Sequence, residues 1–96
     1  MRWSASLAWR IEFEDAAKKE LSRLDQQAAR RIIAFLRDRL APLDDPRALG
    51  GPLKGSRLGE LWKYRVGDYR IITHIEDRIL RVLVVKTGNR RDVYRK

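Results

Sequence analysis

Two arginines flank the dipeptide Gly67-Asp68, at positions 65 and 70. Each lies in a run that alternates apolar and polar residues, and a Gly-Asp step between two such runs is typical of a two-residue β-hairpin turn. A turn of this length sets Arg65 directly opposite Arg70. Because like charges placed opposite each other destabilise a hairpin, the pattern favours a site that holds an anion. A pair of guanidiniums suits a phosphate.

Further cations are predicted on the same face of this hairpin. Side chains alternate across a strand, so Lys63 shares the face of Arg65. Continuing the same register into the next strand places Arg81 beside His74 on that face, although a lone histidine within a strand is usually structural. The alternative is that the cations extend into solvent or pair with acidic residues; the candidates are Glu60, Glu76 and Asp92.

The segment from residue 88 to residue 96 adds more cations and a phenol. Its candidate residues are Arg90, Arg91, Tyr94 and Arg95. An aromatic ring among basic residues can stack on a base while the cations hold the phosphate backbone. The alternative is that Tyr94 anchors this segment to the sheet.

The overall charge points to a polyanionic partner. The 96 residues include 22 Lys and Arg against 13 Asp and Glu, a net charge of +9. Residues 1–50 hold 10 basic and 8 acidic residues, whereas residues 51–96 hold 12 and 5. This concentration of charge beside the candidate site is typical of nucleic-acid binding, and solubility alone is the competing explanation.

Other classes of protein are disfavoured by composition. No apolar run approaches the roughly 18 residues of a spanning helix, and the first residues do not look like a signal peptide, so we expect no membrane contact and a cytoplasmic location. The chain has no cysteine and one histidine, which disfavours disulfides and an ordinary zinc site. No glycine-rich phosphate loop or paired-carboxylate motif is present. We therefore expect neither a cofactor nor a metal.

The elements that must position the cations can be read from periodicity. Ala8 to Phe13 alternates and predicts a strand. Helical spacing then predicts two helices, the first capped by Asp15 and the second ended by Pro42. Their apolar positions are Ala17, Leu21, Leu24 and Ala28, followed by Ile32, Phe35, Leu36 and Leu40. Residues 42–59 hold all three prolines and four of the six glycines, which predicts an irregular connection.

Three antiparallel strands complete the prediction, at Glu60–Val66, Tyr69–Glu76 and Ile79–Gly88. The sequence thus predicts a single α+β domain over residues 1–96, with one strand, two helices and then three strands in two layers. One face of the sheet packs against the helices and the other is open. The predicted core face includes Trp62, Tyr64, Ile71, Leu80, Val82 and Val84, and Trp9 is expected in the core as well.

Most of the chain resembles a known family of toxins. The opening strand and helices match in order, and the recognisable motifs run from Pro52-Leu53-Lys54-Gly55 to Arg90-Arg91-Asp92-Val93-Tyr94. The most specific of them is Tyr64-Arg65-Val66-Gly67-Asp68-Tyr69-Arg70-Ile71. These segments are similar to the RelE branch of the RelE/ParE toxin superfamily. The likeness implies the toxin of a type II toxin–antitoxin pair, with a microbial-ribonuclease type of fold. It also implies an acidic RelB-like antitoxin that can form a higher-order complex on operator DNA.

The same resemblance implies an activity. RelE-type toxins enter the ribosomal A site and cut mRNA without a metal, by attack of a 2′-hydroxyl on the adjacent phosphodiester. The positions that match the family's catalytic residues are Lys63, Arg65, Arg70, Arg90 and Tyr94. Further RNA contacts are expected from Lys54, Arg81, Arg91 and Arg95.

Two questions stay open at this level. A guanidinium is a very poor general base, so Arg65 cannot take up the proton of the attacking hydroxyl, and Lys63 can do so only if its pKa is strongly depressed. The fold is also shared with ParE-like toxins, which poison DNA gyrase without cutting RNA, and a non-catalytic RNA-binding module is a third reading. The arginines at 70, 90 and 91 together with Tyr94 favour the nuclease.

Overall fold

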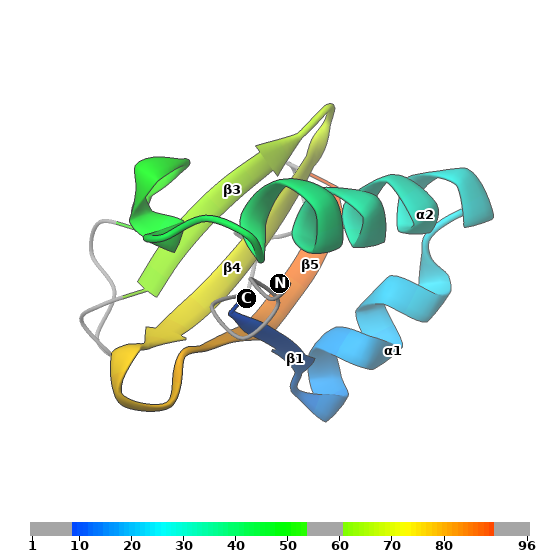
Figure 1. The fold of residues 1–96 in the computed structure, drawn as a ribbon. Helices are drawn as coiled ribbons and strands as arrows, with labels where there is room; N and C mark the ends of the chain where they lie inside the picture. Colours follow the sequence, from blue (N-terminus) through cyan, green and yellow to red (C-terminus); the bar gives the residue numbers. More distant parts are fainter. Residues whose placement is uncertain (1–8, 54–60, 90–96) are drawn as a thin grey trace.

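A computed structural model describes residues 9–53 and 61–89 of the chain (Figure 1). The first half contains strand β1 (Arg10–Phe13), helices α1 (Asp15–Arg23) and α2 (Gln26–Ala34), the π-helical segment η2 (Phe35–Leu40) and the short 3-10 helix η3 (Pro46–Ala48). Strands β2 (Gly51–Pro52), β3 (Leu61–Val66) and β4 (Tyr69–Glu76) follow. The 3-10 turn η4 (Asp77–Ile79) then leads into strand β5 (Arg81–Asn89). None of the helices in the described ranges is long and apolar enough to cross a membrane.

The strands form one sheet in the order β1-β5-β4-β3-β2. β1 runs parallel to β5, and every other neighbouring pair is antiparallel. Helices α1 and α2 lie together on one side of this sheet (Figure 1). The predicted α+β class, its two layers and its order of elements are therefore confirmed.

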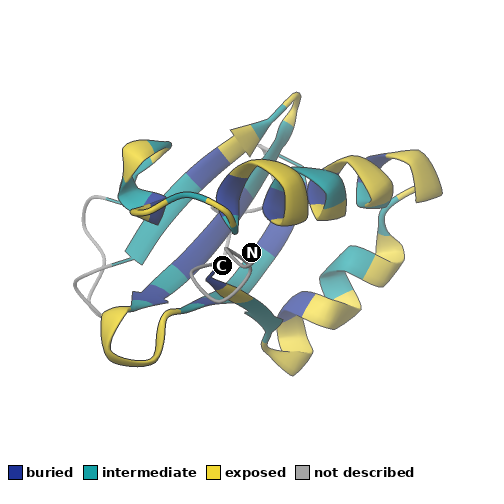
Figure 2. Cartoon of the chain, in the orientation of Figure 1, coloured by how far each residue is buried: buried dark blue, intermediate teal, exposed yellow. Residues whose placement is uncertain are grey.

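The core lies between the helices and one face of the sheet (Figure 2). α2 and η2 contribute Ile32, Leu36 and Leu40, and the central strands contribute Tyr64, Ile71, Val82 and Val84, all at most 2% exposed. The two tryptophans of the described ranges pack here as predicted. The indole N–H of Trp9 donates to the carbonyl of Asp44 (3.2 Å), and that of Trp62 donates to the carbonyl of Leu49 (2.7 Å).

The helix starts differ in part from the prediction. Asp15 does not cap α1; it is the first helical residue, and Glu14 occupies the N-cap position without a side-chain cap bond. At the start of α2, the Asp25 side chain accepts a hydrogen bond from the backbone N–H of Ala28 (2.9 Å). This carboxylate satisfies one of the donors that a helix start leaves without a partner.

The connection between β4 and β5 is longer than predicted. It spans residues 77–80, a 3-10 turn that ends in Leu80 with φ 50°. Leu80 is 43% exposed, so its predicted place on the core face is wrong. The added length shifts the register by two residues: Arg81 pairs with Glu76, and His74 pairs with Leu83. The predicted juxtaposition of Arg81 and His74 is therefore wrong.

Two further features were not predicted. The proline- and glycine-rich connection contains the two-residue strand β2, which pairs Gly51 with Lys63 and covers only the first part of the outer edge of β3. In addition, the face of the sheet away from the helices is not uniformly open, because Ile72 is only 3% exposed there.

α1 is fastened to the far end of β5 by a carboxylate. Glu20 accepts one hydrogen bond from the Lys86 ammonium and one from the backbone N–H of Thr87, each at 2.9 Å. β1 pairs with β5 only as far as Val84. Glu20 therefore supplies the acceptor for a buried N–H that lies past the end of that pairing.

Candidate phosphate-binding site

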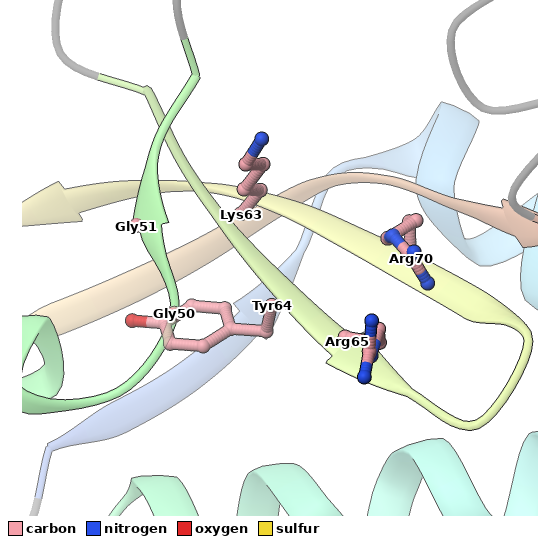
Figure 3. Close-up of a pocket in the computed structure, with 6 residues that line it drawn as sticks. All are labelled: Gly50, Gly51, Lys63, Tyr64, Arg65 and Arg70. Atoms are coloured by element: carbon pink, nitrogen blue, oxygen red, sulfur yellow. The ribbon is translucent and has the colours of Figure 1, made fainter.

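A cavity of about 320 Å³ opens where β2 meets β3 and β4 (Figure 3). Three cations line it, Lys63 and Arg65 from β3 and Arg70 from β4, together with Gly50, Gly51 and Tyr64. We call it the cationic cavity. The sequence predicted that these three cations share a face, and the structure brings them to one hollow.

The hairpin turn sets the spacing of the two arginines. Gly67 has φ 59°, a conformation that glycine adopts readily, so β3 and β4 are joined by two residues. Val66 then pairs with Tyr69, and the next pair is Arg65 with Arg70. The predicted opposition of the two guanidinium-bearing residues is confirmed.

Within residues 9–53 and 61–89, no acid neutralises the charge of the cationic cavity. Among the carboxylates of residues 9–53 and 61–89, none lies within ion-pair distance of Lys63, Arg65 or Arg70. The Arg70 guanidinium donates to the carbonyl of Tyr69 at 3.2 Å, which steadies the side chain and leaves its charge in place. Three clustered cations without an acidic partner in the described part of the chain make a site that attracts an anion.

The backbone of Arg65 also faces this opening. The carbonyl of Leu61 accepts from the N–H of Leu53, the residue after β2 (3.0 Å), so alternate residues of β3 direct their backbone groups toward the outer edge. β2 pairs no further than Lys63. The N–H of Arg65 is the next in that series, and within the described ranges no strand pairs with it. It is available to donate to an oxyanion.

Gly50 and Tyr64 form the wall between the cations and the core. Gly50 has φ 69°, and a Cβ built there would lie 2.2 Å from the Lys63 carbonyl oxygen and 2.8 Å from the Tyr64 ring. The Tyr64 hydroxyl donates to the carbonyl of Pro46 (2.8 Å), and burial raises the pKa of this phenol well above its usual value. Tyr64 is thus a structural wall, not a proton donor at neutral pH.

Arg81 has a different environment from the cavity arginines. Its guanidinium donates to Glu76 on β4 and to Glu12 on β1 (2.7 Å), and so ties three strands together. The hydrogen bond from Arg81 holds the pKa of Glu76 below its usual range, and the two carboxylates raise the pKa of Arg81. His74 is a neighbour of this group, with Nδ1 3.5 Å from Glu76. The RNA contact predicted for Arg81 stays a prediction, and its guanidinium is already engaged.

Five of the predicted site residues lie outside the described residues. They are Lys54, Arg90, Arg91, Tyr94 and Arg95. Conversely, sequence reasoning missed the glycines at 50 and 51 as walls of the cavity. In the sequence, their only indication is the Gly50-Gly51 pair, which lies in the connection predicted to be irregular.

Comparison with known proteins identifies the family of the chain. The family model described as the ParE toxin of the type II toxin–antitoxin system parDE matches residues 11–94. Toxin RelE of Mycobacterium tuberculosis is 31% identical over 87 residues, covering 91% of this chain and 87% of that protein. Toxin RelG of the same organism is 24% identical over 90 residues, covering 94% and 100%.

The fold is also found among solved structures. The toxin–antitoxin complex RelBE2 of M. tuberculosis contains a chain that superposes with a TM-score of 0.78, at 23% identity, covering 90% of this chain and 95% of that one. At this identity the likeness concerns the fold alone. The family model and the curated relatives carry the assignment: the chain belongs to the RelE/ParE family of type II toxin–antitoxin toxins and is a toxin of the RelE type.

Proposed function

We propose that this toxin is a ribosome-dependent endoribonuclease, which cuts mRNA in the A site without a catalytic metal and acts in the cytoplasm. The observation that carries the proposal is the pairing of Arg65 with Arg70 beside Lys63, in a cavity where the described chain supplies no carboxylate to neutralise them. Such an arrangement is destabilising in the absence of a bound anion. Paired guanidiniums suit the bidentate recognition of a phosphodiester.

The proposed chemistry needs little beyond charge and position. The 2′-oxygen of the nucleotide attacks the adjacent phosphorus, the bond from phosphorus to the 5′-oxygen breaks, and a 2′,3′-cyclic phosphate and a 5′-hydroxyl result. Negative charge builds on the non-bridging oxygens during the attack. In this proposal Arg70 and the Arg65 backbone N–H stabilise that charge, which is the usual source of rate enhancement in a preorganised site.

Among the described residues, one side chain of the cavity is a candidate for the proton transfers. Lys63 lines the cavity and is partly buried, so among the described residues it is the candidate for exchanging a proton with the attacking hydroxyl. A guanidinium is a very poor general base, so Arg65 is not a candidate for this role. The predicted roles of Arg90 and Tyr94, which lie outside the described residues, belong to the same proposal.

Programmed ribosomes with a defined A-site codon provide the test. We expect the toxin to cut that codon and to leave the same mRNA intact when ribosomes are absent. The upstream product should end in a 2′,3′-cyclic phosphate, and a 2′-deoxy nucleotide at the cleaved position should block the reaction. A 3′-hydroxyl end would instead indicate attack by water and would contradict the proposed mechanism.

The gyrase-directed alternative is tested in parallel, because the matching family model is that of the ParE toxin. A DNA-supercoiling assay with purified gyrase and the same protein preparation serves this purpose. Gyrase inhibition with no mRNA cleavage would replace the ribonuclease proposal by the ParE-like function. RNA binding with neither activity would indicate a non-catalytic module.

We further propose that a cognate, acidic, RelB-like antitoxin neutralises the toxin and links it to operator DNA. The net charge of +9 makes long-range attraction a large part of such an association. Raising NaCl from 50 to 500 mM should therefore weaken the complex about tenfold or more, since the Debye length falls from about 14 Å to about 4 Å. Isothermal titration with the antitoxin encoded beside this gene measures this, and an affinity that does not change with salt would contradict electrostatic neutralisation.

A further inference from the structure

A second hollow, of about 390 Å³, adjoins the cationic cavity across the outer edge of β3. The two hollows share Gly50, Tyr64 and Arg65 as walls. The second one extends toward η2 and is lined there by Phe35 and Arg39. We call it the edge hollow. A ligand held at Arg65 can therefore reach both spaces at once.

The lining of the edge hollow combines apolar and cationic groups. Phe35, Leu49 and Val66 provide apolar walls, while Arg39 and Arg65 provide guanidiniums. Arg39 is exposed and makes no ion pair with an acid of the described residues, unlike Arg37, which is bound to Asp38 at 2.8 Å. A nucleobase has apolar faces and hydrogen-bonding edges. It fits this combination better than an aliphatic chain or an inorganic ion does.

The shape of η2 is what brings Phe35 and Arg39 to this place. The segment is π-helical, with the N–H of Ala41 bonded to the carbonyl of Leu36 at 2.9 Å. Leu36 and Leu40 are buried in the core, and Phe35 and Arg39, also four residues apart, line the hollow. The Phe35 ring packs on Tyr64 with centroids 5.8 Å apart, so its position is fixed. Wide helical turns of this kind are frequent at functional sites.

We propose that the edge hollow binds the nucleoside attached to the phosphate held in the cationic cavity. The phosphate lies at the junction of the two hollows, where the Arg65 N–H and guanidinium and the Arg70 guanidinium can reach it. The base then extends past Gly50 toward Phe35, and Arg39 contacts its polar edge or its ribose. This inference rests on the proposed ribonuclease function and adds to it a site that selects the nucleotide beside the cut.

Adenosine 5′-monophosphate and inorganic phosphate are suitable probes for the full-length protein without ribosomes. Stacking or packing of one base against an aromatic wall is worth about fivefold or more in affinity, so we expect the mononucleotide to bind at least about fivefold more tightly than phosphate. In amide NMR spectra, both probes should shift the signals of Lys63 and Arg70. Only the mononucleotide should shift those of Phe35 and Leu49.

Arg39→Ala is the informative variant, and Arg30→Ala is its matched control. Both residues are exposed, Arg30 on α2 and Arg39 on η2, which directly follows α2. Each substitution removes one positive charge, and Arg30 lines neither hollow. Arg39→Ala should lower the affinity for the mononucleotide about threefold or more, the loss of one hydrogen bond to the base edge or ribose, with phosphate binding little changed. Arg30→Ala should keep the full difference.

Several outcomes would overturn the inference. It fails if the wild type binds both probes equally, if Arg39→Ala behaves like Arg30→Ala, or if the mononucleotide leaves the Phe35 and Leu49 signals unmoved. These outcomes are separable from failure of the ribonuclease proposal. Mononucleotide binding of the expected kind without cleavage on ribosomes would refute only the enzyme, and cleavage without the affinity difference would refute only the nucleoside site.

Discussion

Replacing Arg70 by alanine is expected to slow mRNA cleavage on programmed ribosomes by about 10²- to 10³-fold, the usual loss when one preorganised donor to a developing oxyanion is removed. Arg70 is half-buried in the cationic cavity, and its guanidinium is steadied by the Tyr69 carbonyl. Under the proposed mechanism, this guanidinium stabilises the negative charge that builds on the phosphate oxygens during attack. Single-turnover cleavage at saturating ribosome concentration measures the effect, because it reports the chemical step rather than binding.

The fold should survive this change. Removing Arg70 relieves its repulsion with Arg65 across the hairpin, so the free energy of unfolding should stay the same or rise slightly. Arg78→Ala is the charge-matched control, since Arg78 lies exposed in the η4 turn, and it should cut at nearly the wild-type rate. Equal cleavage rates for the two variants would show that Arg70 does not act in the site.

Gly50→Ala should lower the free energy of unfolding by about 2–4 kcal/mol, the range expected for left-handed backbone strain combined with a steric clash. The new Cβ would lie 2.2 Å from the Lys63 carbonyl oxygen, and φ 69° is unfavourable for alanine. The segment must move away from β3 to relieve the clash. That movement also opens the wall shared by the two hollows, so cleavage should fall together with stability.

The neighbouring glycine offers a matched control. A Cβ at Gly51 meets no heavy atom within 4 Å, so Gly51→Ala should change stability by no more than about 0.5 kcal/mol. Urea unfolding of both variants, followed by tryptophan fluorescence, gives the comparison. If the two substitutions had equal effects, the close contact between Gly50 and β3 would not be what determines the shape of the site.

The part of the site that could be predicted from sequence is the part set by local rules. Strand alternation gave the shared face of Lys63 and Arg65, and the Gly67-Asp68 turn gave the pairing of Arg65 with Arg70. These inferences need only the two-residue period of a strand and the length of one turn. Both are encoded within a few neighbouring residues.

The parts that were missed depend on contacts between distant segments. The position of Arg81 depends on whether two or four residues connect β4 to β5. Leu80 is apolar yet exposed, so the hydrophobic pattern does not reveal the length of this connection. Likewise, β2 is a strand only because Gly51 lies against Lys63. The edge hollow requires a π-helical turn at Phe35 together with the loop at Leu49, which no periodicity in the sequence links.

The place of β5 in the sheet has a consequence for synthesis of the toxin. β5 follows every other described strand in the chain, yet it lies between β1 and β4. Until residues 81–89 have left the ribosomal tunnel, β1 has no strand to pair with, and the β2–β3–β4 part of the sheet lacks its neighbour β5. The sheet that carries the cationic cavity is therefore completed only after these residues have been translated.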